Sequence, residues 1–197
     1  MARSRFRADA RLGERVKRVI LVAFQYPPMS GTSGIQRALR FSQYLPQFGW
    51  EPIVLTAKPI AYETTSTDQL TDVPSDIHVE RAFALDTARH LSFRGRYLKM
   101  LAAPDRWMSW WLGAVPKGLQ LIRRFRPQAI WSTFPIPTAH RIGLALHKRT
   151  RLPWIADFRD VMTEDGYPSD PYIARRWTNL ERKTIVHCSR AVFTTSG

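Results

Sequence analysis

The chain has 197 residues, of which 44% are hydrophobic and 23% charged, a composition that is typical of a globular domain and that excludes a disordered chain. Thirty lysines and arginines stand against sixteen aspartates and glutamates, so the formal net charge is +14 and the pI is about 10.8. Such a charge favours polyanionic partners, namely nucleic acid, an anionic membrane surface or phosphorylated substrates. The single cysteine, Cys188, excludes an intramolecular disulfide and a cysteine-based metal cluster, and it fits a reducing compartment.

The N-terminal segment, residues 1–18, is rich in arginine and lacks the apolar core of a signal peptide. We interpret it as a basic, disordered arm, with a mitochondrial presequence as the alternative. No apolar run approaches the ~20 residues that a membrane-spanning helix requires. We therefore expect a cytoplasmic protein, with peripheral attachment to the inner face of the cytoplasmic membrane as an open alternative.

The first predicted elements form a strand–helix–strand unit. Residues 19–24 are a continuous apolar run, VILVAF, which is typical of a buried parallel strand. From Gly34 to Phe48 apolar residues recur every three or four positions, which predicts an amphipathic helix that Gly49 ends. The run EPIVLT at 51–56 predicts the next strand. The connection between two such parallel strands is expected to be right-handed.

The same alternation continues along the chain. After a polar connection, we expect in order a strand at 77–82, a partly helical stretch at 86–103, a helix at 107–125, a strand at 129–133, a helix at 138–150, a strand at 153–158, a helix at 171–188 and a strand at 191–196. Repeated strand–helix pairs predict an α/β fold over residues 19–197, a Rossmann-like, doubly wound and mostly parallel sheet with helices on both faces.

A glycine-containing loop follows the first strand. In open α/β sheets ligands bind beyond the carboxyl ends of the strands, and the loop PPMSGTSGIQR lies at such an end. Gly31 and Gly34 allow positive φ and close backbone approach, and Ser33 with Gln36 would form a capping box. The positive end of the helix dipole favours a phosphate there, and a plain strand-to-helix turn is the alternative. The spacing matches neither the dinucleotide-binding fingerprint nor a P-loop.

Charged residues follow the strand at 153–158. Asp157, Arg159 and Asp160 stand at its carboxyl end, where unpaired charges are costly. Asp157 pairing with Arg159 or capping nearby backbone is one interpretation. The other is functional: Asp160 and Arg159 in a cleft would orient a sugar hydroxyl and a phosphate. His140, which opens the helix after the strand at 129–133, would donate to a ligand hydroxyl, or would only cap the helix or be exposed.

Three tryptophans lie at helical spacing in PDRWMSWW. Trp107, Trp110 and Trp111 would pack in the core, or, with the surrounding arginines and lysines, would contact a membrane surface. Cys188 is interpreted as a small buried apolar residue and not as a nucleophile.

With these segments in order, the chain resembles the N-terminal domain of glycosyltransferase family 4-like proteins, which have the GT-B fold. The resemblance rests on five segments, which follow one another in the family's order between residues 18 and 196: RVILVAFQYPPMSGTSGIQRALRFSQYLPQFGWEPIVLT, PDRW, STFPIPTAHRIGLAL, LPWIADFRDVM and LERKTIVHCSRAVFTTS. It implies an acceptor-side domain that normally faces a second, donor-binding domain across a cleft. No residues remain for that second domain, so we expect half of an enzyme, without robust transfer activity alone.

The resemblance also implies residue roles. Gly31, Ser33 and Gly34 would lie against the diphosphate of a nucleotide-sugar donor, a co-substrate of an enzyme that needs no other cofactor and no metal for its chemistry. Arg159 stands where many relatives have a histidine near the reacting centre. An arginine stays protonated and cannot act as a base, so Arg159, flanked by Asp160, would act electrostatically.

Acceptor recognition is the domain's other implied role. We assign acceptor contacts to His140, Asp105 and Asp157, and the implied acceptor is a glycan or a lipid-linked, cell-envelope molecule.

Two other function classes compete with this interpretation. A non-catalytic basic module on anionic membrane or nucleic acid would explain the charge, but no recognised nucleic-acid motif is present, so nucleic acid is an unlikely partner. A nucleotide-cofactor oxidoreductase is disfavoured, because the dinucleotide fingerprint and its ribose-binding acid are missing.

Overall fold

The computed structural model describes residues 16–194, and most of the predicted basic arm therefore lies outside the described residues. Six strands form one sheet. Their bounds are β1 Lys17–Val22, β2 Trp50–Ala57, β3 His78–Ala82, β4 Ala129–Thr133, β5 Trp154–Arg159 and β6 Arg190–Phe193. Each lies within three residues of its predicted bounds, and β1 and β2 contain the continuous apolar runs that mark buried strands.

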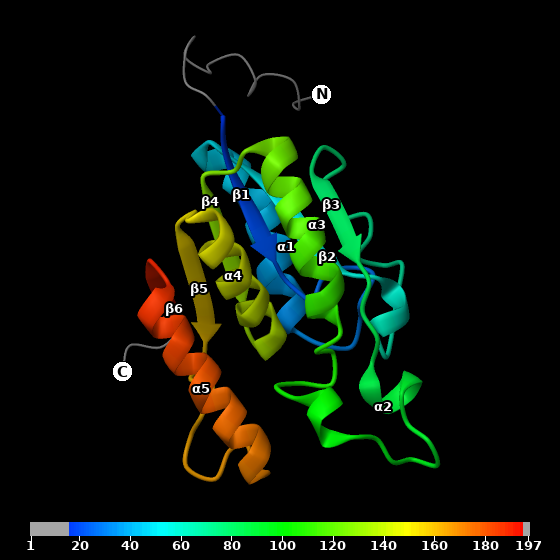
Figure 1. The fold of residues 1–197 in the computed structure, drawn as a ribbon. Helices are drawn as coiled ribbons and strands as arrows, with labels where there is room; N and C mark the ends of the chain where they lie inside the picture. The colour runs from blue at the N-terminus through cyan, green and yellow to red at the C-terminus, as the bar shows by residue number, and fades with distance from the viewer. Residues whose placement is uncertain (1–15, 195–197) are drawn as a thin grey trace.

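Five α-helices and three short 3-10 helices connect the strands in the described part of the chain (Figure 1). The α-helices are α1 Gly34–Tyr44, α2 Thr87–His90, α3 Trp110–Phe125, α4 Pro137–Thr150 and α5 Pro171–His187. The 3-10 helices are η1 Leu45–Phe48, η2 Pro59–Ala61 and η3 Lys99–Ala102. The predicted first helix thus changes to 3-10 geometry after Tyr44, and Gly49 ends it as expected, with φ of 75°.

The sheet is entirely parallel, with the strand order β3-β2-β1-β4-β5-β6. This is the order of a dinucleotide-binding Rossmann domain, in which the strand order reverses between β1 and β4. The predicted fold class, a doubly wound Rossmann-like sheet, is confirmed. The reversal matters for function, because open α/β sheets bind ligands beyond the carboxyl ends of the strands where the strand order reverses.

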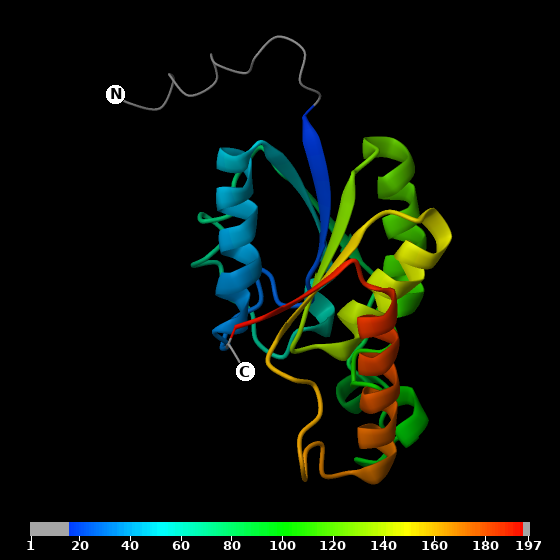
Figure 2. The same ribbon diagram turned by 90° about the vertical axis from the view of Figure 1, so that its left-hand side faces the viewer.

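Two layers of helices enclose the sheet. Figure 2 shows α1 on one face and α3, α4 and α5 on the other. Neighbouring residues of β1 point to opposite faces and are both buried: Ile20 and Val22 face one cluster of apolar side chains, and Val19 and Leu21 face the other. Because the side chains on both faces of β1 are buried, successive positions are all apolar and the strand appears in the sequence as one unbroken apolar run.

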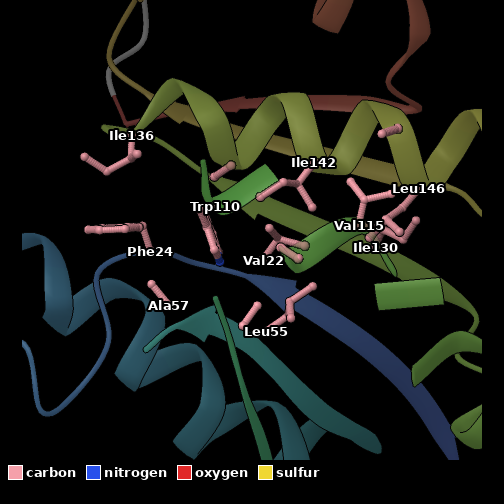
Figure 3. Packing of buried hydrophobic residues seen from close by; sticks show 14 of the residues in the cluster. Val22, Phe24, Leu55, Ala57, Trp110, Val115, Ile130, Ile136, Ile142 and Leu146 are labelled. Carbon is pink, nitrogen blue, oxygen red and sulfur yellow. The ribbon is translucent and has the colours of Figure 1, made fainter. Parts of the chain in front are cut away.

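The larger core lies between the sheet and helices α3 and α4 (Figure 3). Trp110 is fully buried there, and its ring packs edge-on against Phe24 at a centroid distance of 5.4 Å. Its indole Nε1 donates to the Thr56 carbonyl at 3.3 Å. Helix α3 begins at this residue, three positions later than predicted.

The ambiguous stretch at 86–103 is partly helical, as expected, and an ion pair between Asp86 and Arg106 joins its two ends. Asp86 is fully buried and accepts two hydrogen bonds from the Arg106 guanidinium, at 2.8 and 2.6 Å. The same carboxylate caps the first turn of α2 by accepting from the Ala88 N–H at 3.0 Å. These bonds fix both ends of a segment that otherwise extends away from the sheet (Figure 1).

Candidate functional site at the carboxyl end of the sheet

The glycine-containing loop lies directly after β1 and is held by backbone hydrogen bonds to residues 64–66. The Ser30 N–H donates to the Thr64 carbonyl at 3.1 Å, and the Ser66 N–H donates to the Pro28 carbonyl at 2.9 Å. Gly31 has φ of 81°, in the left-handed region that favours glycine. The loop is therefore a fixed backbone turn, held against residues 64–66 of the polar connection that follows β2.

The predicted capping box at the start of α1 is wrong. Ser33 has helical backbone angles and makes no side-chain cap, and its side chain is exposed. Thr32 satisfies a backbone donor at the start of the helix instead, because its hydroxyl accepts from the Gly34 N–H at 3.3 Å. The positive end of the α1 dipole remains at this point.

Because Gly34 has no side chain, the polar side chains of Gln25 and Arg159 can lie directly against its backbone. A Cβ on Gly34 would lie 1.8 Å from Oε1 of Gln25 and 3.0 Å from Nη1 of Arg159. The Gln25 Oε1 is buried and has no hydrogen-bond partner among the described residues. Three groups thus meet at one place: the Gln25 amide, the Arg159 guanidinium and the first residue of α1. No pattern in the sequence predicted that Gln25 would be part of this site.

Arg159 has an unusual backbone conformation for a residue that ends a strand. Its φ is 65°, and the pairing of β5 with β6 is irregular between Asp157 and Arg159. A non-glycine residue with positive φ carries strain, which is found most often where function requires a side chain in a set place. Asp160 follows with an exposed side chain. The two charges therefore lie at the carboxyl end of β5, and their roles at a cleft and in catalysis stay predictions.

Asp157 has a different partner from the one predicted. Its carboxylate is fully buried and accepts from Nε and Nη2 of Arg37, both at 2.6 Å. A third hydrogen bond comes from the Thr133 hydroxyl at 2.8 Å. The hydrogen bond with Asp157 raises the pKa of Arg37 above its usual value. Asp157 thus joins α1 to β4 and β5 and is not free to contact an acceptor in this arrangement.

His140 is neither exposed nor a helix cap. Its side chain is fully buried, and Nδ1 lies 2.8 Å from the Ser132 hydroxyl, which also accepts from Nε1 of Trp154 at 2.8 Å. Burial lowers the pKa of His140 to about 3, so the ring is neutral at physiological pH. The expected contact between His140 and a ligand hydroxyl is not possible in this arrangement.

Asp105 is also buried, and its carboxylate accepts hydrogen bonds from two backbone N–H groups. Its carboxylate accepts from the Thr138 N–H at 2.7 Å and from the Trp107 N–H at 3.0 Å. Burial raises the pKa of this carboxyl above its usual value. Asp105 thereby caps the first turn of α4 from a distant segment, and the structure gives it no open face toward an acceptor.

The tryptophan stripe belongs mainly to the core. Trp110 is fully buried, so its predicted membrane contact is wrong. Trp107 and Trp111 are partly buried against the same core; Trp107 Nε1 donates to the Ala61 carbonyl at 3.1 Å, and Arg141 lies 5.2 Å from the Trp111 ring centroid. A membrane contact by these two residues stays a prediction, with only part of each ring available.

No protein-family model and no curated protein matches the sequence. Solved structures share the fold. Sucrose-phosphate synthase from Thermosynechococcus elongatus superposes with a TM-score of 0.54 at 11% identity over 89% of this chain, and the chain spans 41% of that protein. A Streptomyces sp. SF2575 glycosyltransferase, complexed with thymidine diphosphate, superposes with a TM-score of 0.50 at 13% identity. The match covers 87% of this chain and 45% of the glycosyltransferase chain. The chain thus has the fold of a domain found in glycosyltransferases about twice its length.

The described residues give two further results. No helix within 16–194 is long and apolar enough to cross a membrane. No group of three or more histidine, cysteine, aspartate or glutamate side chains in that range is placed to hold a metal ion.

Proposed function

We propose that this chain is the acceptor-side half of a nucleotide-sugar-dependent glycosyltransferase, which transfers a sugar to a cell-envelope or lipid-linked acceptor. The observation that carries the proposal is the meeting of the α1 start, the positive-φ loop and the Arg159 guanidinium at the carboxyl end of the sheet. A helix start and a guanidinium at the strand-order reversal favour a phosphate group. The fold shared with glycosyltransferases supports the same assignment at the level of architecture.

The proposed roles follow from charge and position. The backbone of Gly31, Ser33 and Gly34 would border the donor diphosphate. Arg159 would stabilise the negative charge that develops on the leaving diphosphate, because a guanidinium stays protonated and donates in a fixed geometry. Asp160, exposed beside it, would orient a hydroxyl of sugar or acceptor. A second domain would bind the rest of the donor, so the chain alone is expected to bind a nucleoside diphosphate weakly and to transfer nothing.

Calorimetric titration with uridine diphosphate and thymidine diphosphate tests the phosphate site. Arg159→Gln should weaken binding by about tenfold or more, since a charge-assisted hydrogen bond to phosphate is lost. Arg151→Gln is the matched control, because Arg151 also has positive φ, 62°, but caps the far end of α4. Equal affinity of the Arg159→Gln variant and the unsubstituted chain would refute the site.

Activity distinguishes the half-enzyme from a complete one. The chain is incubated with a panel of nucleotide sugars and lipid-linked acceptors, and release of nucleoside diphosphate is followed. We expect none above the rate of donor hydrolysis in buffer. Sustained turnover by the chain alone would contradict the need for a second domain.

A further inference from the structure

An exposed surface that combines apolar and basic side chains lies near the start of α5. The segment between α2 and α3 contributes residues 91–100, in which Phe93 is 77% exposed, Leu98 66% and Met100 63%. The whole stretch 87–104 contains four arginines and lysines and no aspartate or glutamate. We call residues 91–100, together with the exposed arginines of α5 described next, the basic–apolar face.

Helix α5 adds a row of arginines to this face. Arg175 and Arg182 stand seven residues apart, about two helical turns, and Arg176 follows Arg175. All three are exposed and line a surface hollow of about 770 Å³. None of the three belongs to an ion pair among residues 16–194. Arg176 also lies near Arg141 of α4, whose pKa is lowered by burial and by that neighbouring charge. These cations therefore lack carboxylate partners within the described structure.

The two parts of the face are joined. Lys99 donates to the carboxylate of Asp170, the N-cap of α5, at 2.7 Å, and Trp177 Nε1 donates to the Pro104 carbonyl at 2.6 Å. Figures 1 and 2 both place the start of α5 beside the segment between α2 and α3, at the end of the molecule toward which the strands point. The face thus shares one end of the sheet with the candidate phosphate site.

We infer that the basic–apolar face docks the protein on an anionic phospholipid surface. Exposed phenylalanine, leucine and methionine side chains enter the boundary between headgroups and acyl chains, while the arginines contact lipid phosphates. A protein partner fits less well, because the cores of protein interfaces are depleted in charge, whereas here the Arg94 guanidinium lies 5.5 Å from the centroid of the exposed Phe93 ring. The inference does not depend on the proposed sugar transfer.

Vesicle binding tests the apolar part of the face. Binding of the whole chain is measured by co-sedimentation with phosphatidylcholine vesicles with and without phosphatidylglycerol. We expect binding to the anionic vesicles, weakened by salt, and Phe93→Ser with Leu98→Ser should lower the partition coefficient by about tenfold or more. Phe48→Ser is the control, because Phe48 is 75% exposed but precedes β2, at the opposite end of the sheet. Binding equal on neutral vesicles, or absent from both, would overturn the inference.

Charge removal tests the arginine row. Arg175→Gln with Arg176→Gln should weaken binding about fivefold for each removed charge at low salt. Arg123→Gln with Arg124→Gln changes the net charge equally, but those exposed residues end α3, just before β4 starts. An equal loss in the two double variants would mean that only net charge matters and would refute a defined face. All variants replace exposed side chains, and unchanged circular dichroism and melting temperature confirm that they fold.

An environment-sensitive fluorophore locates the contact directly. It is attached at Leu98→Cys or at Phe48→Cys in a Cys188→Ser background, which removes the only native thiol. A blue shift on anionic vesicles at position 98 but not at position 48 is expected. The same shift at both positions, or none at position 98, would overturn the proposed orientation and with it the face.

Discussion

Replacing Arg37 with methionine tests the ion pair that joins α1 to β5. In the folded chain the fully buried Asp157 carboxylate accepts two hydrogen bonds from Arg37, both at 2.6 Å, and would keep only Thr133 at 2.8 Å. Removing one partner of a buried pair costs about 3–5 kcal/mol, because the other charge stays buried without compensation. The Arg37 side chain is 25% exposed, so water reaches the pair and the lower value, about 3 kcal/mol, is expected. That loss lowers the melting temperature by roughly 6–12 °C for a chain of this length.

Urea unfolding at pH 7 measures the effect, with Arg40→Met as the matched control. Arg40 lies one turn further along α1, is exposed and bonds only Gln43 at 2.8 Å, so its replacement should change the free energy of unfolding by less than about 0.5 kcal/mol. The double variant Arg37→Met with Asp157→Leu should recover part of the loss, because no charge then remains buried. A loss below about 1 kcal/mol in Arg37→Met would refute the stabilising role of this pair.

Three further predictions concern the core and the loop. Gly143→Ala should destabilise the fold by about 1–3 kcal/mol in urea unfolding, because a Cβ there would lie 2.5 Å from Nε1 of the buried Trp154. His140 has a folded-state pKa of about 3, below its usual value, so the unfolded chain binds a proton first as pH falls. Stability should therefore fall between about pH 6.5 and 3, with a slope near 1.4 kcal/mol per pH unit that His140→Phe removes; an unchanged slope in the variant would contradict burial of the ring. Gly31→Ala should cost about 1 kcal/mol, because φ is 81° there, and thermal unfolding that matches the unsubstituted chain would argue against the left-handed turn.

The strands and most helices follow from local patterns, and the candidate site follows only in part. Strand β1 is apolar at every position from Val19 because it is buried on both faces, so it is easily recognised as a continuous apolar run. The spacing of Trp107, Trp110 and Trp111 predicted one helical side, but spacing alone does not say whether that side meets the core or the solvent. Only the packing of Trp110 against Phe24 decides this.

Long-range pairing explains what local patterns missed. Arg37 and Asp157 are separated by 120 positions, and neither residue has a neighbour in sequence that indicates the other. The prediction for Asp157 used the nearest cation along the chain, Arg159, whereas the parallel sheet brings the first turn of α1 over the end of β5. The same limit applies to Asp105, which caps α4 from 33 positions away.

The conformation of Arg159 differs in kind from the other positive-φ arginines of the described chain. Arg126 and Arg151 are C-caps of α3 and α4, where a left-handed residue completes the helix end, and Arg94 lies in a tight turn. Arg159 instead ends a buried strand, where extended geometry would carry no strain. Its guanidinium reaches toward the same point as the buried, unpaired Oε1 of Gln25. Two departures from ordinary local preference at one place are expected where a structure serves binding more than stability, and this singles out the start of α1 and the end of β5 as the candidate site.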